Sequence, residues 1–495
     1  MKKFPSLFAS SVIAIGFLAF LTGVPSGCSG GGGKTDTVVQ DSTTPLNGTF
    51  FTLSDVHFNP FYDTTLTLQL MQTDVSGWEA VFQSSKIQTY GVYNEDSNYP
   101  LMSSAFAAMK GVKADPDFIV ITGDFLGHNF QADFQKYAHI PNTSPQYTTA
   151  VQGFITKTIQ FIAMELAKQF PNTYFYPVLG NNDDFCGDYM IQPNDPFLPM
   201  FAETWAPYFD SVNRVSLMTT FPTEGYYTAS LPGHPEHVIV GMNTMYFSKK
   251  NQKPNKKDEN PDCTPIDTAS GTNELVWLTS TLKSCQQENQ KVWFTCHIPP
   301  GAEARSGVAG LEAPGSCPDS IKMMWGGEYD STFIALERQY AGTINGGIGG
   351  HTHMDEYRLI MDQNGSPISF FHINPSISPI DGNNSAFQLF TYDPATMTML
   401  GYTSHVFNGL EPGGPATWTL QYDFNKTYGV TAITGTSLGA VWNALETDTV
   451  LQNQYMNYFC GGGSGAKPVK WLPYWCCIGC AEKATFSNCV CQPMK

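Results

Sequence analysis

The sequence predicts a layered α/β fold, with a mixed β-sheet or two packed sheets flanked by helices, followed by a helical, cysteine-rich C-terminal part. Three observations lead to this class. Short apolar runs alternate with helical patterns, later apolar runs follow one another without long helices between them, and six of the twelve cysteines lie from residue 460 onward. Such alternation is typical of helices layered on a sheet.

The predicted strands are short apolar runs, rich in β-branched and aromatic residues, of the kind that form buried strands. They lie at 49–53, 118–122, 174–179, 292–296, 343–348, 369–373 and 387–392. Two segments, 151–170 and 273–286, instead space their apolar residues three and four apart, and we expect helices there. After about His405 the strand pattern gives way to helical spacing.

Composition limits the class of function. Of the 495 residues, 42% are hydrophobic and only 14% are charged, which is typical of a folded extracytoplasmic enzyme. The formal net charge is −17, and no basic stripe is visible, so we expect no nucleic-acid-binding surface. This acidic balance repels phosphate groups at long range, so any chemistry on phosphate needs a local source of positive charge, such as metal ions.

The N-terminus has the features of a targeting segment. Lys2 and Lys3 precede an apolar stretch at 7–24, and small residues then lead to Cys28, as in a signal peptide. Residues 24–28 resemble a bacterial lipobox, although Pro25 stands where Leu is usual. We therefore expect an extracytoplasmic protein, either anchored as an outer-membrane or cell-surface lipoprotein through a lipidated Cys28 or simply secreted.

The predicted domains follow from these patterns. They are a signal peptide at 1–28, a glycine-rich linker at 29–48, a catalytic domain at 49–404 and a helical, disulfide-rich subdomain at 405–495. Eleven cysteines follow Cys28, and in an exported chain this density predicts disulfides. A zinc knuckle at 477–480 is the alternative for part of the C-terminal group. Because eleven is an odd number, at least one thiol is expected to stay free, and Cys296 in an apolar strand is the candidate.

Metal-binding side chains follow five of the predicted strands directly. The runs are D-V-H at 55–57, G-D at 123–124, G-N-N-D at 180–183, a histidine at 297 and G-H-T-H at 350–353. Imidazole, carboxylate and amide oxygens are ligands of divalent transition metals, and open α/β sheets place their sites at the carboxyl ends of strands. Each motif alone is common, but an ordered series of five is not expected by chance. We also expect Gly123, Gly180 and Gly350 to allow sharp backbone turns beside the cluster.

This series resembles the signature of calcineurin-like metallophosphoesterases over roughly residues 49–392. The resemblance implies a sandwich of two mixed sheets flanked by helices, and a centre of two divalent metal ions. Zn²⁺ is the expected metal, and Mn²⁺ or Fe fits the same ligands. Position by position, the implied ligands are Asp55, His57 and His353 for the first ion, Asp124 as the bridge, and Asn181, His297 and His351 for the second.

Further motifs resemble the acid sphingomyelinase-like branch, namely H-I-P-P-G at 297–301, the extension of G-H-T-H through Met354-Asp355-Glu356, N-P-S at 374–376 and the terminal cysteines. The implied reaction is hydrolysis of a phosphodiester by a hydroxide shared between the two ions. The family usually has His where this chain has Asn182, and G-N-N-D is also similar to endopolyphosphatases. An amide cannot transfer a proton, so the role of general acid is expected to pass to His128, with Asn182 steadying the phosphate.

Substrate class stays open at this point. A phospholipid headgroup, a nucleotide and polyphosphate all fit, as do phosphomonoesters, and we expect a monomer. Two other classes were weighed. G-T-S-L-G at 435–439 matches the G-x-S-x-G pattern of serine hydrolases, but no histidine follows Ser437 to complete that triad. A non-catalytic metal- or phosphate-binding protein is the second alternative, motivated by Asn182.

Overall fold

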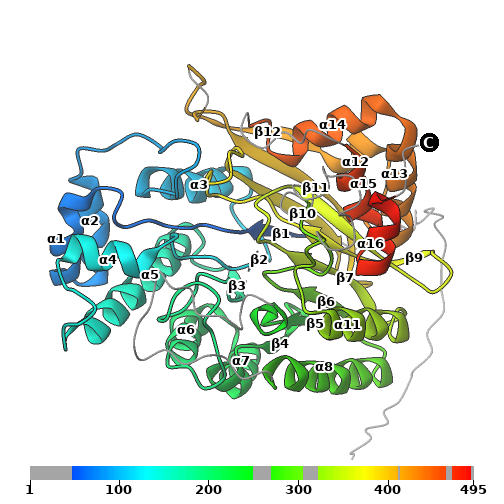
Figure 1. Cartoon of the computed structure of the whole chain (residues 1–495), viewed down its shortest axis with the longest axis horizontal. Coiled ribbons are helices and arrows are strands. Elements are labelled where there is room, and N and C mark those ends of the chain that lie inside the picture. Colours follow the sequence, from blue (N-terminus) through cyan, green and yellow to red (C-terminus); the bar gives the residue numbers. More distant parts are fainter. Residues whose placement is uncertain (1–46, 249–268, 305–320, 411–412, 464–470, 492–495) are drawn as a thin grey trace, which may run out of the picture. The chain divides into compact units, whose positions relative to one another are not determined.

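The computed structural model gives the fold of most of the chain (Figure 1). The residues that it describes are 47–248, 269–304, 321–410, 413–463 and 471–491. The expected signal peptide, Cys28 and nearly all of the linker lie outside these residues. Within the described part, no helix combines the length and the apolar character that a membrane span requires.

The first sheet has six strands in the order β12-β11-β10-β1-β2-β3. Strands β1, β2 and β3 are parallel, and β10, β11 and β12 join them as an antiparallel extension. The sequence of β2, Phe-Ile-Val-Ile, is buried at every position, as expected for a parallel strand covered on both faces. The bounds are β1 Gly48–Leu53, β2 Phe118–Ile121, β3 Tyr174–Pro177, β10 Ala386–Asp393, β11 Thr398–Phe407 and β12 Trp418–Asp423.

The second sheet also has six strands, in the order β4-β5-β6-β7-β9-β8. Its four inner strands are parallel, and the edge strands β4 and β8 run antiparallel to their neighbours. The bounds are β4 Tyr227–Leu231, β5 His234–Gly241, β6 Lys291–Thr295, β7 Ile344–Gly349, β8 Glu356–Met361 and β9 Pro367–Ile373. Both sheets are therefore mixed, which confirms the predicted fold class.

Aromatic side chains join the two sheets. Phe50 of β1 stacks on Phe118 of β2 and lies 5.4 Å, centroid to centroid, from Trp293 of β6 in the other sheet. His372 of β9 packs edge-on against Phe390 and Tyr402 of the first sheet. Large buried rings contribute much of the apolar area that holds such layers together.

Helices cover both sheets and the loops between them (Figure 1). The predicted helices at 151–170 and 273–286 correspond to α5 and α8, and α8 packs on β6. The helices before the C-terminal part are α1 Thr67–Gln72, α2 Trp78–Gln83, α3 Tyr99–Val112, α4 Phe130–Ala138, α5 Tyr147–Gln169, α6 Phe197–Trp205, α7 Ser211–Glu224, α8 Ser270–Gln287 and α11 Gly327–Gln339, with 3₁₀ turns at Thr64–Leu66, Val75–Gly77, Ala206–Tyr208 and Thr244–Phe247.

The C-terminal part is helical, as expected, but the sheet extends further than the sequence indicated. The expected boundary after residue 404 falls inside β11, and β12 then adds a further strand to the same sheet. The helices that follow are α12 Phe424–Tyr428, α13 Gly435–Thr447, α14 Thr449–Phe459, α15 Trp471–Gly479 and α16 Lys483–Val490. Helix α13 packs on β9 and α15 on β8, so this part rests on the second sheet.

The cysteines follow the expectation in part. A disulfide joins Cys476 of α15 to Cys489 of α16, and Cys296 is a free, buried thiol as predicted. Cys477 and Cys480, the cysteines of the alternative zinc knuckle, are both unoxidised. The terminal cysteines are thus only partly consumed by disulfides.

The serine of the G-x-S-x-G motif has a structural role in this fold. Thr434 caps α13, and the Ser437 side chain completes a capping box with the Thr434 backbone. The Ser437 hydroxyl also donates to the carbonyl oxygen of Ala432 at 2.7 Å. These contacts account for the motif as a helix start.

Candidate metal centre

The seven predicted ligands come together at the carboxyl ends of five strands. Asp55 and His57 follow β1, Asp124 follows β2 and Asn181 follows β3. From the second sheet, His297 follows β6, and the loop after β7 carries His351 and His353. The site therefore spans both sheets, at the edge where parallel strands of an α/β fold direct their following loops.

Asp124 occupies the middle of this group. Its Oδ2 atom lies 3.3 Å from Nε2 of His57 and 3.3 Å from Nε2 of His297. The ligands form two clusters, Asp55–His57–His353 and Asp124–His297–His351, and Asp124 also contacts His57 of the first cluster. Asn181 joins the second cluster, because its Oδ1 atom lies 3.0 Å from Nε2 of His297. One carboxylate between two ligand clusters is the arrangement that a bridging ligand needs.

Burial in this centre leaves polar atoms without hydrogen bonds. Asp55, His57 and His297 are completely buried, and among the described residues Oδ1 of Asp55 makes no hydrogen bond, although it lies 3.3 Å from Nε2 of His353. The Nε2 atoms of His57 and His353 face each other at 3.1 Å. A buried carboxylate oxygen without a hydrogen bond is costly unless a cation binds it, and imidazole nitrogens are ligands of the same cations. The donor set present here therefore fits divalent metal ions.

Electrostatics within the centre are strong. Burial opposes ionisation of Asp55, but the neighbouring imidazoles of His353 and His297 lower its pKa to about 2. Burial, aided by His128, lowers the pKa of His57 to about 4, so this imidazole is neutral and its lone pair is available. For His297 burial acts in the same direction, but the carboxylates of Asp124 and Asp55 outweigh it and raise the pKa to about 9.

Backbone carbonyls orient two of the imidazoles. Nδ1 of His57 lies 3.0 Å from the carbonyl oxygen of Leu126, and Nδ1 of His297 lies 2.7 Å from that of Thr122. A carbonyl oxygen can only accept, so each Nδ1 carries a proton. Nε2 of the neutral His57 presents its lone pair to the centre, whereas Nε2 of His297 does so only once a bound cation displaces the second proton that its raised pKa retains.

The backbone is strained at the ligands themselves. Five of the seven have left-handed φ angles between +39° and +73°, which non-glycine residues rarely adopt, namely Asp55, His57, Asp124, His351 and His353. Such strain costs roughly 1–3 kcal/mol for each residue and persists where function requires it. No local sequence pattern indicates this feature.

Glycines beside the ligands allow the backbone segments of the centre to pack closely, although not all of them do so through a sharp turn as expected. Gly123 has φ of +90° and makes the sharp turn. Gly180 and Gly350 have no such φ and are required by space instead. A Cβ atom at Gly180 would lie 2.1 Å from the backbone nitrogen of Asp124, and one at Gly350 would lie 2.3 Å from Oγ of Ser54.

His128 lies at the rim of the centre. Its ring stacks on His57 with 4.2 Å between centroids, and its side chain is 38% exposed. Asp96 holds it, because Oδ1 lies 2.9 Å from Nδ1 and Oδ2 accepts from the backbone nitrogen at 2.7 Å. Burial lowers the pKa of His128, but the hydrogen bond and charge of Asp96 outweigh this and raise it to about 9. The imidazole is thus protonated at neutral pH.

Asn182 points at the central carboxylate. Its backbone nitrogen donates to Oδ1 of Asp124 at 2.8 Å, and its Nδ2 donates to Oδ2 at 3.0 Å. Asp183, which follows it, is buried and accepts from the backbone nitrogens of Asp124, Phe125, Leu126 and Gly180. Sequence reasoning missed Asp96 and the anchoring role of Asp183. Asp96 follows no predicted strand, so only the tertiary structure reveals it.

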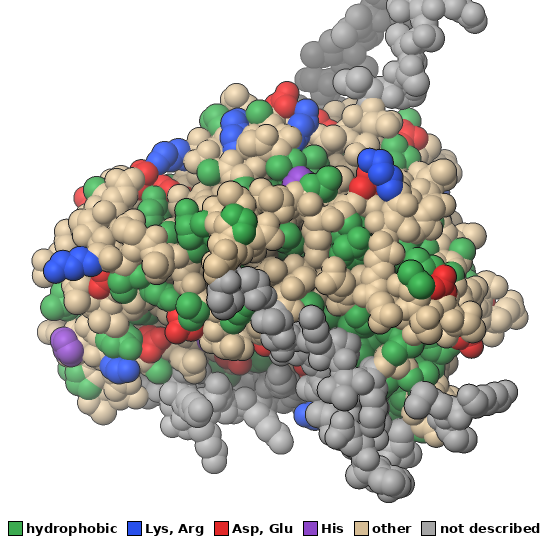
Figure 2. Space-filling view, turned by 90° about the horizontal axis from the view of Figure 1, so that it is seen from above, with side chains coloured by type: hydrophobic (Ala, Val, Ile, Leu, Met, Phe, Trp, Pro, Cys, Tyr) green, Lys and Arg blue, Asp and Glu red, His purple; other side chains and the backbone are tan. Residues whose placement is uncertain are grey.

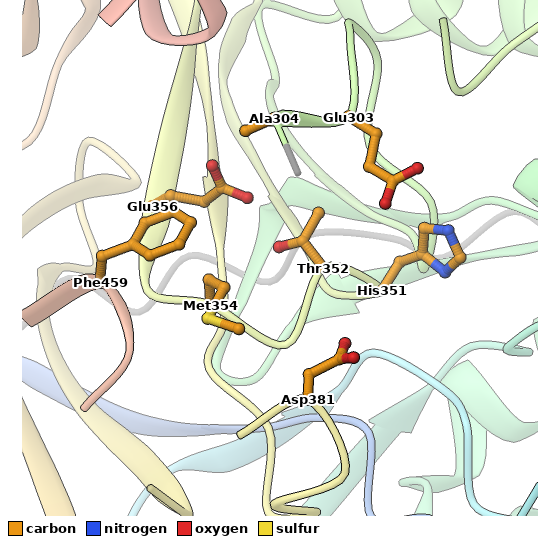
Figure 3. A pocket seen from close by; sticks show the side chains of 8 residues that line it. All are labelled: Glu303, Ala304, His351, Thr352, Met354, Glu356, Asp381 and Phe459. Carbon is orange, nitrogen blue, oxygen red and sulfur yellow. The ribbon is translucent and has the colours of Figure 1, made fainter. Parts of the chain in front are cut away.

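A pocket opens beside His351 (Figure 3). Its empty volume, counted with its open mouth, is about 330 Å³. The lining combines carboxylates with the loop between the two histidines and with apolar groups, and consists of Glu303, Ala304, His351, Thr352, Met354, Glu356, Asp381 and Phe459. Phe459 comes from the end of α14, so the C-terminal part reaches this pocket.

Comparison with known proteins agrees with this centre. Residues 49–355 match the family of calcineurin-like phosphoesterases. The chain is 28% identical to sphingomyelinase phosphodiesterase D of Dictyostelium discoideum, over 86% of this chain and 91% of that protein. It is 24% identical to the cyclic GMP-AMP phosphodiesterase SMPDL3A of Rattus norvegicus, over 84% of each.

Solved structures with a similar chain course include PhoD, with 12% identity, a TM-score of 0.43 and coverage of 79% of this chain and 70% of that one. A dimetal phosphatase from Danio rerio has 12% identity and a TM-score of 0.38, with coverage of 72% and 95%. The family match spans more than half of the chain and includes all seven predicted ligands. The predicted resemblance is therefore confirmed, and the chain belongs to the calcineurin-like phosphoesterase family, as a hydrolase that acts on phosphoric ester bonds.

Proposed function

We propose that this protein is a phosphodiesterase of the acid sphingomyelinase-like branch, with two divalent metal ions, preferably Zn²⁺, held by the seven ligands described above. The observation that carries the proposal is the position of Asp124, whose Oδ2 atom lies 3.3 Å from imidazole nitrogens of both clusters. Bound there, the ions would neutralise the phosphate and activate water for attack on phosphorus.

The protein's own side chains supply the remaining steps. His128, protonated and held by Asp96, donates a proton from its ring to the departing alkoxide oxygen. Asn182 uses both its backbone and side-chain N–H groups on Asp124. We therefore assign Asn182 to holding the bridging carboxylate, in place of the phosphate contact expected from sequence.

The substrate class is proposed from the relatives. Their names include a sphingomyelinase phosphodiesterase and a cyclic GMP-AMP phosphodiesterase, so a diester is the favoured substrate. An endopolyphosphatase or phosphomonoesterase activity is the second candidate, favoured by Asn182 in the G-N-N-D motif. Export, with or without a lipid on Cys28, is also part of the proposal, and fractionation of cells that express the wild type or Cys28→Ala tests it.

The central experiment measures turnover and metal content on one sample. Bis-p-nitrophenyl phosphate should be hydrolysed, a chelator should abolish the activity, and added Zn²⁺ or Mn²⁺ should restore it. Sphingomyelin, cyclic GMP-AMP, nucleotide triphosphates and polyphosphate then rank the substrates. A protein that binds two ions but hydrolyses none of these compounds would be the non-catalytic binding protein instead.

A further inference from the structure

The loop after β3 folds back onto the ligand that begins it. The turn at Gly187 has φ of +96°, and Tyr189 has φ of +61° although it carries a large side chain. The backbone nitrogen of Tyr189 donates to the carbonyl oxygen of Asn181 at 2.7 Å. Tyr189 is only 5% exposed, so this strained backbone lies in the interior beside the metal centre.

Asp188 determines which end of the Asn181 amide faces the centre. Nδ2 of Asn181 donates to Oδ1 of Asp188 at 2.7 Å, while Oδ1 of Asn181 lies 3.0 Å from Nε2 of His297. An amide nitrogen does not bind a cation, whereas an amide oxygen does. Without the acceptor on Asp188, the amide loses the contact that keeps its oxygen on the metal side.

Tyr189 acts on the other ligand of the same cluster. Its hydroxyl lies 3.3 Å from Nε2 of His351, and the two rings meet edge-on, with 6.2 Å between centroids and 89° between planes. Together these contacts limit rotation of the imidazole ring about its Cβ–Cγ bond. Outer partners of this kind typically change metal affinity by about 10- to 100-fold.

We propose that Asp188 and Tyr189 are positioning residues that orient Asn181 and His351 and thereby set the affinity of the second metal ion. The proposal rests on the dinuclear centre proposed above. It assigns to one dipeptide an effect on the second ion but not on the first. Both contacts fall on the ligands of the second ion, while Asp55, His57 and His353 form the first cluster. The two ions should therefore respond differently to changes at 188 and 189.

The test measures metal binding directly. The full chain, stripped with a chelator, is titrated with Zn²⁺ alone against a chromophoric competitor, and both dissociation constants are determined. The wild type should bind two equivalents. In Asp188→Ala and Tyr189→Phe one of the two constants should rise by about 10- to 100-fold while the other stays within about twofold. Asp188→Asn keeps a side-chain oxygen as acceptor and should bind nearly as the wild type does.

Tyr208→Phe is the matched control, because the Tyr208 ring packs against Phe175 and Trp205, neither of which is a proposed metal ligand, and it should change neither constant. Wild-type binding in both test variants, or equal weakening of both sites, would overturn the inference. If Asp188→Ala fails to fold, as judged by circular dichroism, Tyr189→Phe decides, since it removes one oxygen only. Absence of a Zn²⁺ pair in the wild type would instead refute the dinuclear centre itself.

Discussion

At the scale of single residues, the centre depends on how firmly Asp124 is held. Its carboxylate receives two hydrogen bonds from Asn182, and its backbone nitrogen donates to Asp183. Burial alone would favour a neutral acid, yet the imidazoles of His297 and His57 keep the pKa of Asp124 well below its usual value. This carboxylate is therefore charged and fixed before any cation arrives, which is the preorganisation that metal-assisted catalysis needs.

Asp124→Asn should nearly abolish activity. The neutral amide retains the shape of the side chain but cannot bridge two cations, so at least one metal equivalent should be lost. We expect kcat/KM on bis-p-nitrophenyl phosphate to fall by at least about 10³-fold. Asp115→Asn, at an exposed ion pair with Lys113, is the control and should be fully active. Undiminished turnover by Asp124→Asn would refute the two-metal centre.

His128→Ala should affect poor leaving groups most. A p-nitrophenolate departs without protonation, whereas an alkoxide needs the proton that His128 carries. Loss of a general acid costs about 10²–10⁴-fold, so we expect this range on an alkyl phosphodiester and a much smaller loss on a p-nitrophenyl ester. The comparison of kcat on the two substrates is the measurement. Equal losses on both would assign His128 a structural role beside His57.

At the scale of elements, the C-terminal helices support the loop that carries the last ligands. The backbone nitrogen of Asp355, two residues after His353, donates to the carbonyl oxygen of Phe459 at 2.9 Å. Trp442 of α13 and Trp475 of α15 stack, and each donates its indole N–H to the backbone carbonyl of the other. The ion pair between Arg338 of α11 and Glu482 adds a further contact to α16. The helical part is thus packed closely against the catalytic sheet.

Cys476→Ser should lower stability through the loss of the α15–α16 disulfide. The two cysteines are separated by 13 positions in the sequence. A disulfide that closes a loop of this length stabilises the fold by about 3 kcal/mol, because it lowers the entropy of the unfolded chain. Urea denaturation of the wild type and the variant measures the difference. Cys480→Ser, at a free and partly exposed thiol, is the control. Equal stability of the wild type and Cys476→Ser would show that helix packing alone holds this part.

Ser437→Ala separates the helix cap from a serine nucleophile. Because Ser437 completes the capping box of α13, its removal should cost about 1 kcal/mol of unfolding free energy and leave kcat unchanged. Paired denaturation and hydrolysis assays check both expectations. Loss of turnover without loss of stability would support a serine hydrolase with Ser437 as the nucleophile.

At the scale of the whole molecule, several acids are buried in the interior. On the face seen in Figure 2, Lys and Arg side chains stand singly among polar and apolar groups. In the interior, Glu274 of α8 and Glu337 of α11 are completely buried, and burial raises the pKa of each to about 8. In the folded protein these two side chains therefore stay protonated at pH values below about 8.

Stability should decrease as pH rises from about 5 to 8. The pKa of Glu337 in the folded state is raised above its ordinary value, so between these two pKa values the folded state binds more protons than the unfolded state. The stabilisation that follows from this is complete below the ordinary pKa and is lost as pH rises toward the folded pKa. The slope is at most about 1.4 kcal/mol per pH unit for each such group. Urea denaturation at several pH values measures it.

Glu337→Gln is the comparison for this pH effect, because the amide keeps the size of the side chain and cannot ionise. As pH rises, the unfolding free energy of the wild type should fall relative to that of Glu337→Gln. Parallel curves for the two proteins would show that Glu337 ionises at its ordinary pKa.

Three features follow from the sequence alone, namely the fold class, the main buried strands and the residue types directly after them. These features are local, because an apolar run specifies a strand and a motif directly after it is carried to the strand's end, as for Asp55, Asp124 and His297. Five strands were not predicted, namely β4, β5, β8, β11 and β12, because edge strands and half-exposed runs lack a continuous apolar pattern.

The contacts between groups far apart in the sequence depend on the folded chain. Asp96 and His128 are 32 residues apart, Tyr189 and His351 are 162 apart, and no local pattern links either pair. The direction of Asn182 toward Asp124 and the left-handed backbone at five ligands likewise depend on packing around the centre. Contacts across such separations form because two sheets bury their common face, and that face exists only when the whole chain has folded.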